Sequence, residues 1–278
     1  MKYMIRLLCP FMTSLIILLS AFPLALSAQE DVWDVYIAQY DEGPGSTLIN
    51  MSLKQVAPLK QFPFVLITGV KVTDCTDEGF PTPAEFQKLY VVSDSVQAFV
   101  NRTANHKFAG TFTYQCERLD YFYITDTAGI RKKLQQLYAS AFPSYQPYIN
   151  IRHDASWEAY LDFLYPNEVT YEYMLNQKVV MRLEEAGDKL EKERQVDHWL
   201  YFKTEIDREC FVTYATKNRF TIISKSKAES AEAPYQLVIV RNDKVTIPDI
   251  SALTLQLRKQ AVQCNGTYDG WETLVVKE

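Results

Sequence analysis

Apolar residues follow two spacings along the chain, one typical of strands and one typical of helices. Residues 33–40 and 46–53 alternate apolar and polar positions around the segment "DEGPG", which predicts a hairpin with a longer turn. The apolar run at 62–72 predicts a buried strand. Residues 108–114 and 120–126 predict two further strands around a turn near Glu117 and Arg118.

Two helices are predicted among these strands, at residues 82–100 and 129–142. The first begins with Thr82 as its cap, Pro83 at the first helical position and Glu85 three residues after the cap. The residues at helical spacing that predict its buried side are Phe86, Leu89, Tyr90, Val96, Phe99 and Val100. Strands and helices together predict an α+β domain.

The second half begins with a short helix at 156–166 and a longer one at 167–187. The remaining elements follow the order β-α-β-β-α-β: strand 198–202, helix 205–218, strands 219–224 and 235–241, helix 249–264 and strand 270–276. This order is that of a ferredoxin-like split βαβ sandwich. The polar segment 224–234 between the middle strands is predicted to be a mobile surface loop.

The N-terminus has the layout of a signal peptide. Lys2 and Arg6 precede an almost uncharged run that ends in small residues at Ala25, Ser27 and Ala28. An uncleaved membrane anchor is the alternative, since about 20 apolar residues span a bilayer. The predicted organisation is a signal peptide at 1–28, an α+β domain at 29–166, a bridging helix and linker at 167–189, and a ferredoxin-like domain at 190–278. The mature protein is expected in the periplasm or outside the cell.

The net charge and the number of cysteines limit the functions that the protein can have. The formal net charge is −5, and no basic cluster is present that would neutralise phosphates, so no nucleic-acid partner is expected. Four cysteines follow the signal segment: Cys75, Cys116, Cys210 and Cys264. In an exported chain they predict two disulfides. In a split βαβ unit the start of the first helix adjoins the end of the second helix. Because Cys210 and Cys264 lie at these two ends, a Cys210–Cys264 bridge is predicted, and the remaining cysteines are expected to form a Cys75–Cys116 bridge. The alternative for Cys210 and Cys264 is two buried thiols in contact.

Two segments resemble known families. "GDKLEKERQVDHWLYFKTEIDRECFVTYATKNRFTI" together with "YDGWET" resembles the regulator of ribonuclease E activity B family, over residues 182–277. The segments "WDVYIAQYDEGPGSTLINMSL", "TFTYQCERLDYFYITD" and "SWEAYLDFLYP" are similar to the uncharacterised family called domain of unknown function 695. The first resemblance implies a ferredoxin-like inhibitor domain that acts by binding another protein. Ribonuclease E works in the cytoplasm, so an exported chain needs a different partner, which the sequence does not name.

Two groups of residues are candidates for that contact. Strand alternation puts Trp199 and Tyr201 on the side of the sheet opposite Leu200. If the helices cover the Leu200 side, this pair lies on an open face. The alternative is that the bridging helix or the first domain covers the pair. In "YDGW", Asp269 and Gly270 are expected to form the turn into the last strand, with Trp271 packed against the core. The alternative is a contact surface made of Tyr268, Asp269 and Trp271.

The sequence contains no convincing motif for catalysis or for metal binding. Asp74, Thr76, Glu78, Gly79 and Glu85 have the spacing of a calcium loop, but a strand leads into them and the helix cap explains Glu85, so no metal is predicted. The histidines His106, His153 and His198 are scattered, and no cofactor is predicted. The sequence therefore favours a non-catalytic binding or regulatory protein. An exported hydrolase-like enzyme, with a site assembled from scattered carboxylates and histidines, and a structural envelope protein are the alternatives.

Overall fold

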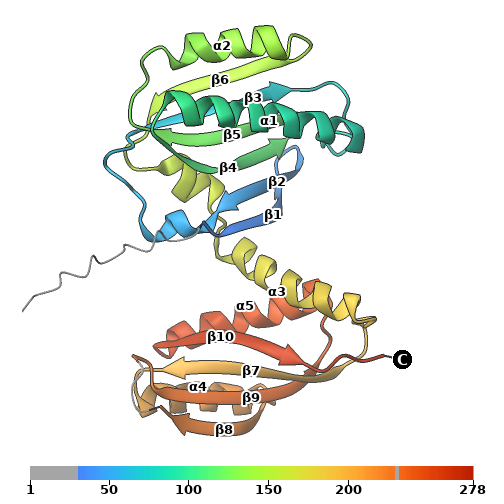
Figure 1. The fold of residues 1–278 in the computed structure, drawn as a ribbon. Helices are drawn as coiled ribbons and strands as arrows, with labels where there is room; N and C mark the ends of the chain where they lie inside the picture. The colour runs from blue at the N-terminus through green and yellow to red at the C-terminus, as the bar shows by residue number, and fades with distance from the viewer. Residues whose placement is uncertain (1–30, 229–231, 278) are drawn as a thin grey trace, which may run out of the picture. The chain divides into compact units, whose positions relative to one another are not determined.

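The computed structural model describes residues 31–228 and 232–277. The predicted signal peptide lies outside the described residues, as do residues 229–231 of the predicted surface loop. Two antiparallel sheets organise the described chain (Figure 1).

The first sheet has six strands in the order β1-β2-β4-β5-β3-β6. Its strands are β1 (Trp33–Tyr40), β2 (Gly43–Asn50), β3 (Phe64–Lys71), β4 (His106–Tyr114), β5 (Glu117–Ile124) and β6 (Gln146–His153). One face packs against α1 (Pro83–Thr103) and α2 (Ile130–Ala141) (Figure 1). The other face packs against the short turns η1 (Met51–Gln55) and η2 (Ala159–Leu164). The central strands are therefore buried on both sides.

Helix α1 begins at the predicted N-terminal cap, Thr82. The Thr82 hydroxyl accepts a hydrogen bond from the backbone N–H of Glu85 at 3.4 Å, and Pro83 occupies the first turn. Leu89, Val96 and Val100 are buried as predicted. The prediction for Tyr90 is wrong, because its ring is 47% exposed and lies against the Arg118 guanidinium, 5.2 Å from ring centroid to Cζ.

The two predicted turns of the first sheet need correction, and one of its strands is missing from the prediction. The β4–β5 turn lies at Gln115 and Cys116, both with positive φ, which is the conformation of a tight hairpin turn. The first hairpin turns at Asp41 and Glu42 alone, and β2 ends at Asn50 because that side chain caps η1. The edge strand β6 was not predicted.

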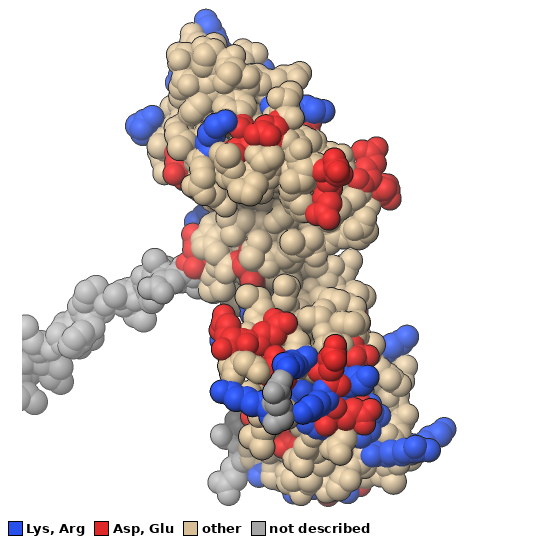
Figure 2. Space-filling model, turned by 90° about the vertical axis from the view of Figure 1, so that its right-hand side faces the viewer, with Lys and Arg blue, Asp and Glu red and all other residues tan. Residues whose placement is uncertain are grey.

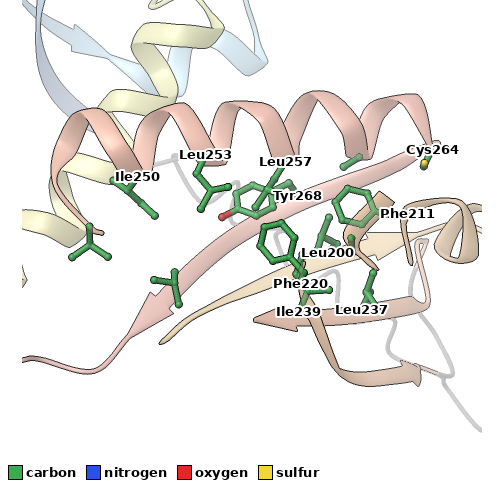
Figure 3. Close-up of a cluster of buried hydrophobic side chains, with 14 of the residues drawn as sticks. Leu200, Phe211, Phe220, Leu237, Ile239, Ile250, Leu253, Leu257, Cys264 and Tyr268 are labelled. Atoms are coloured by element: carbon green, nitrogen blue, oxygen red, sulfur yellow. The ribbon is translucent and has the colours of Figure 1, made fainter. Parts of the chain in front are cut away.

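The second sheet has four strands in the order β10-β7-β9-β8, each antiparallel to its neighbour. In chain order the elements are β7 (Arg194–Phe202), α4 (Glu205–Lys217), β8 (Thr221–Lys227), β9 (Tyr235–Asp243), α5 (Ile247–Gln263) and β10 (Gly266–Thr273). Figure 3 shows the core on the helix side, where Leu253 and Leu257 of α5 and Phe211 of α4 face Leu200 and Leu237. Helix α3 (Glu168–Glu185) adds Val180 and Leu183 to the same core.

The predicted turn at Asp269 and Gly270 is wrong. The chain turns at Cys264 and Asn265, and β10 is already paired with β7 from Gly266 onward. Asp269 is an extra residue between Tyr268, which pairs with Leu200, and Gly270, which pairs with Trp199. The "DG" sequence therefore forms a β-bulge inside the strand.

Candidate binding face of the C-terminal sheet

Strand β7 separates a covered face from an open face. Leu200 and Phe202 are fully buried between sheet and helices. The intervening residues Trp199 and Tyr201 point to the opposite face, because successive side chains alternate along a strand, and both are partly exposed. Helix α3 packs against α5 on the covered side, where the Asn176 amide donates to Thr254 Oγ1 at 2.8 Å. The part of α3 that packs on this sheet thus lies away from Trp199 and Tyr201.

The centre of the open face is apolar. Across from Trp199 on β9 lies Val238, and the next residue on that side of β9 is Val240; neighbouring side chains leave these valines only 8% and 9% exposed. On the other flank, β10 places Gly270 directly across from Trp199. Glycine has no side chain to cover the indole, and a Cβ added there would meet no described atom within 4 Å outside its immediate neighbours. No side chain from position 270 therefore covers this flank of Trp199.

A hydrogen-bonded row borders this apolar centre on one side. The Gln236 amide donates to the Tyr201 hydroxyl at 2.9 Å, and its carbonyl oxygen accepts from Ser226 Oγ at 2.9 Å. The three residues come from three adjacent strands, β7, β9 and β8. The row orients the Tyr201 ring, so the open face presents its two aromatic side chains in a defined arrangement.

The other end of the open face is acidic. Asp197 and Glu272 lie directly across from one another on β7 and β10. Together with Arg194 and Leu274 they line a hollow of about 550 Å³, and Leu274 is 84% exposed. An apolar, aromatic centre beside a carboxylate pair is suited to a surface that carries apolar and basic side chains.

Tyr268 and Trp271 of the "YDGW" segment lie on the helix side of the sheet, whereas Asp269 is exposed. Tyr268 is buried on the helix side, and its hydroxyl lies 2.9 Å from Nδ1 of His198. Trp271 is partly buried there too, and its indole N–H donates to Asn176 Oδ1 at 2.8 Å. Asp269 is exposed at the bulge. The structure thus brings Tyr268 and Trp271 together under the helices and separates them from Trp199 and Tyr201.

His198 is buried beneath this sheet. Burial of the imidazole, together with the positive charge of Arg241, lowers the pKa of His198 to about 3. Its Nε2 atom is buried without a hydrogen-bond partner among the described residues. The histidine is therefore neutral at physiological pH and forms part of the core.

Two disulfides are present. Cys210 of α4 and Cys264, which caps the end of α5, are joined with their Cα atoms 5.8 Å apart. Cys75 and Cys116 are joined with a Cα separation of 6.0 Å. Both separations lie within the usual range for disulfides. The first bridge ties the two helices together beside the start of β10, and the second ties the β4–β5 turn to the loop before α1.

The histidines do not converge. His106 and His153 lie in one row of the first sheet, on β4 and β6, with β5 and β3 between them. Three strand spacings separate them by about 14 Å. His198 belongs to the other sheet. Across residues 31–228 and 232–277, no group of three or more histidine, cysteine or acidic residues is placed to hold a metal ion.

The residues with calcium-loop spacing have other partners. Glu85 accepts hydrogen bonds from Lys88 Nζ at 2.8 Å and from the Tyr145 hydroxyl at 2.7 Å. The hydrogen bonds from Lys88 and Tyr145 hold the pKa of the Glu85 carboxyl below its usual value. Asp74 accepts from the Thr82 hydroxyl at 2.9 Å. These contacts account for Glu85 through the helix cap and for Asp74 through the loop before it.

Figure 2 shows acidic and basic side chains interspersed on one side of the C-terminal region, without a continuous basic area. The sequence did not indicate Gln236, Val238, Gly270 or Glu272 as parts of the open face. Each becomes a neighbour of Trp199, Tyr201 or Asp197 only through the register of β7 with β9 and β10. Alternation alone identified the two aromatic residues.

These features define a class: a two-sheet α+β protein whose second sheet has one face covered by helices and one face open. Residues 31–165 match a family of unknown function (DUF695), and residues 174–273 match the family Regulator of ribonuclease activity B. Both family resemblances predicted from the sequence are thereby confirmed, whereas the domain boundaries stay a prediction. No curated protein matches the chain. None of the helices in the described part of the chain has the length and apolar character needed to cross a membrane.

Proposed function

We propose that this protein is an exported, non-catalytic regulator that acts by binding another protein through the open face of its C-terminal sheet. The match to Regulator of ribonuclease activity B supports a regulatory, protein-binding role. The observation that supports this surface is the partly exposed pair Trp199 and Tyr201, on a face of the sheet opposite the one that packs against α3, α4 and α5. We assign the β-α-β-β-α-β unit to the ferredoxin-like class on its strand order.

The partner we propose differs from ribonuclease E, because a signal peptide at residues 1–28 takes the chain out of the cytoplasm. The carboxylates of Asp197 and Glu272 beside the aromatic centre favour a partner surface that combines basic and apolar side chains. Aromatic residues in the centre of a contact surface commonly provide most of the binding free energy. Trp199 is accordingly the residue whose truncation should weaken binding most.

Affinity purification from the envelope fraction of the natural host tests the surface. The variant Trp199→Ala/Tyr201→Ala is compared with Ile206→Ala/Val262→Ala, which removes two exposed apolar residues from the helix side, 82% and 67% exposed. We expect one protein that is recovered with the wild type and with the helix-side variant and is reduced at least about tenfold with the open-face variant. Equal recovery with both variants would contradict the proposal.

Export has a separate test. Mass spectrometry of the natively produced protein should show a mature chain that begins at Ala28 or Gln29. A membrane-bound chain that retains Met1 would show that the segment is an uncleaved anchor. If the protein were found in the cytoplasm with Met1 intact, the export proposal would be wrong. The proposed binding face would stand, and its partner could then be a cytoplasmic protein.

A further inference from the structure

A second candidate site lies in the N-terminal sheet, at the edge that α1 and α2 leave uncovered. On the α1 side of β1, Val35 and Ile37 are 58% and 66% exposed. At one end of this strip, where α1 ends, the start of β1 and the start of β4 border a cleft of about 340 Å³. Its volume lies within the range of small-molecule sites.

Aromatic rings form one wall of this cleft. The Trp33 and Phe108 rings are 5.2 Å apart between centroids, and Phe108 stacks on Phe122 at 4.9 Å. Phe122 is fully buried, which fixes the base of the stack, whereas Trp33 is 37% exposed. The cleft therefore presents a supported aromatic surface with one accessible indole.

Amide side chains form the opposite wall. Gln97 and Asn101 extend from the last turns of α1, and among the described residues neither side chain has a hydrogen-bond partner. Asn50 is 98% buried and also lines the cleft. Its Oδ1 accepts from the backbone N–H of Ser52 at 3.1 Å and from Ser52 Oγ, while its Nδ2 donates to no described atom. An amide donor on the cleft lining that no described protein group satisfies can donate a hydrogen bond to a ligand oxygen.

A second, shallower hollow of about 520 Å³ continues the cleft around the end of α1 and shares Asn101 and His106 with it. The last carbonyl groups of a helix lack partners within the helix and can accept hydrogen bonds from ligand hydroxyls. Two adjoining hollows with a shared border can hold two linked rings.

The charge balance narrows the ligand class. Asp31 and Lys107 are the ionised side chains on the lining of the main cleft, one of each sign. A phosphate or carboxylate ligand would gain little electrostatic attraction from this lining. A neutral ring with one apolar C–H face for the indole and several hydroxyl or amide groups for Asn50, Gln97 and Asn101 matches the aromatic and amide parts of the lining.

We infer that this cleft binds a neutral sugar through stacking on Trp33 and hydrogen bonds to the three amides. The inference does not rest on the proposed protein-binding function. An N-acetylated hexose is the favoured unit, since its acetamido group can pair with side-chain amides as both donor and acceptor. Because the two hollows adjoin, the β-1,4-linked disaccharide should bind more tightly than the single ring.

The chain contains four tryptophans, so indole N–H resonances in a nitrogen-15 correlation spectrum report on Trp33 separately. We expect a saturable shift of the Trp33 signal on titration with N-acetylglucosamine and chitobiose, with dissociation constants of about 0.1–5 mM. The Trp199 signal should stay in place. Glucose and maltose, which lack the acetamido group, should bind more weakly.

Calorimetry of variants completes the test. Trp33→Ala and Asn101→Ala should each weaken chitobiose binding about tenfold or more, and Trp199→Ala should leave it unchanged. Asn101 is exposed at the end of α1, so its variant keeps the test valid even if Trp33→Ala folds poorly. No saturable shift with any of the four sugars, or unchanged affinity in Asn101→Ala, would overturn the inference. Loss of protein partner recovery would bear on the proposed function alone.

Discussion

The two sheets of this protein differ in how many of their faces are covered. In β3 of the first sheet, the consecutive residues Val65, Leu66 and Ile67 are all buried, because helices lie on one side and the η1 and η2 segments on the other. In β7 of the second sheet, buried Leu200 alternates with partly exposed Trp199 and Tyr201. A sheet covered on both sides offers a surface only at its margins, whereas a sheet covered on one side offers a whole face. The same contrast separates the cleft proposed to bind a sugar from the face proposed to bind a protein.

The largest effect should come from the covered sheet. Trp157 is fully buried, stacks on Tyr123 with ring centroids 3.8 Å apart, and donates its indole N–H to the Phe62 carbonyl at 3.0 Å. Trp157→Ala should lower the free energy of unfolding by about 3–5 kcal/mol, because it leaves a cavity and an unpaired carbonyl. Urea denaturation measures it. A loss below about 1 kcal/mol would contradict the packing described for this face.

The Cys210–Cys264 bridge should have the next largest effect. It closes a loop with a sequence separation of 54 residues. Replacing both cysteines with serine should lower the free energy of unfolding by about 2–4 kcal/mol, because the unfolded chain regains conformational freedom. Urea denaturation of the double variant, with and without reductant, checks this. If wild type and variant unfold at the same urea concentration without reductant, the bridge contributes nothing to the helix layer.

His198 should make the covered face of the second sheet sensitive to acid. Its pKa is about 3 in the folded chain and about 6.5 when unfolded. Between these values the unfolded chain binds a proton that the folded chain does not, so stability falls as pH decreases, by up to about 1.4 kcal/mol per pH unit. His198→Gln should remove about 2–3 kcal/mol of the loss measured between pH 7 and pH 4.5.

The exposed histidine His153 supplies the control for this experiment. His153→Gln should leave the stability difference between the two pH values unchanged. If His198→Gln and the wild type lose the same stability on acidification, the imidazole does not remain neutral in the folded chain.

The smallest stability effect should come from the open face. Trp199→Ala removes a partly exposed ring whose flank at Gly270 is uncovered, and it should lower the free energy of unfolding by about 1 kcal/mol or less. The stability losses of Trp157→Ala and Trp199→Ala compare the same substitution on a covered face and on an open face. Equal losses in urea denaturation would remove the contrast between the sheets.

The sequence predicted the elements whose signals are local. Thr82 caps α1 as expected, α3 begins directly after Asn167, close to the predicted helix start, and the alternation of β7 correctly separated Leu200 from Trp199. Strand β6 was missed because it is an edge strand that begins with Gln146 and Pro147, two residues with low strand propensity. The bulge at Asp269 was read as a turn because both use glycine after a small polar residue, and only pairing with β7 distinguishes them.

The sites were less predictable than the elements. The open face depends on the register that places Gln236 and Val238 beside Tyr201 and Trp199. The proposed sugar cleft combines Trp33, Asn101 and His106, which come from a strand, a helix end and another strand. No local pattern links positions so far apart in sequence, so both sites follow from tertiary structure.

The central claim is that a partner protein covers the Trp199 and Tyr201 face. Site-specific photo-crosslinking in the natural host tests this most directly, with benzoylphenylalanine placed at position 201 or, as the helix-side control, at position 206. The account predicts one discrete adduct from position 201, lost when Trp199→Ala is added to the same chain, and no such adduct from position 206. An adduct from position 206 with none from position 201 would contradict the account.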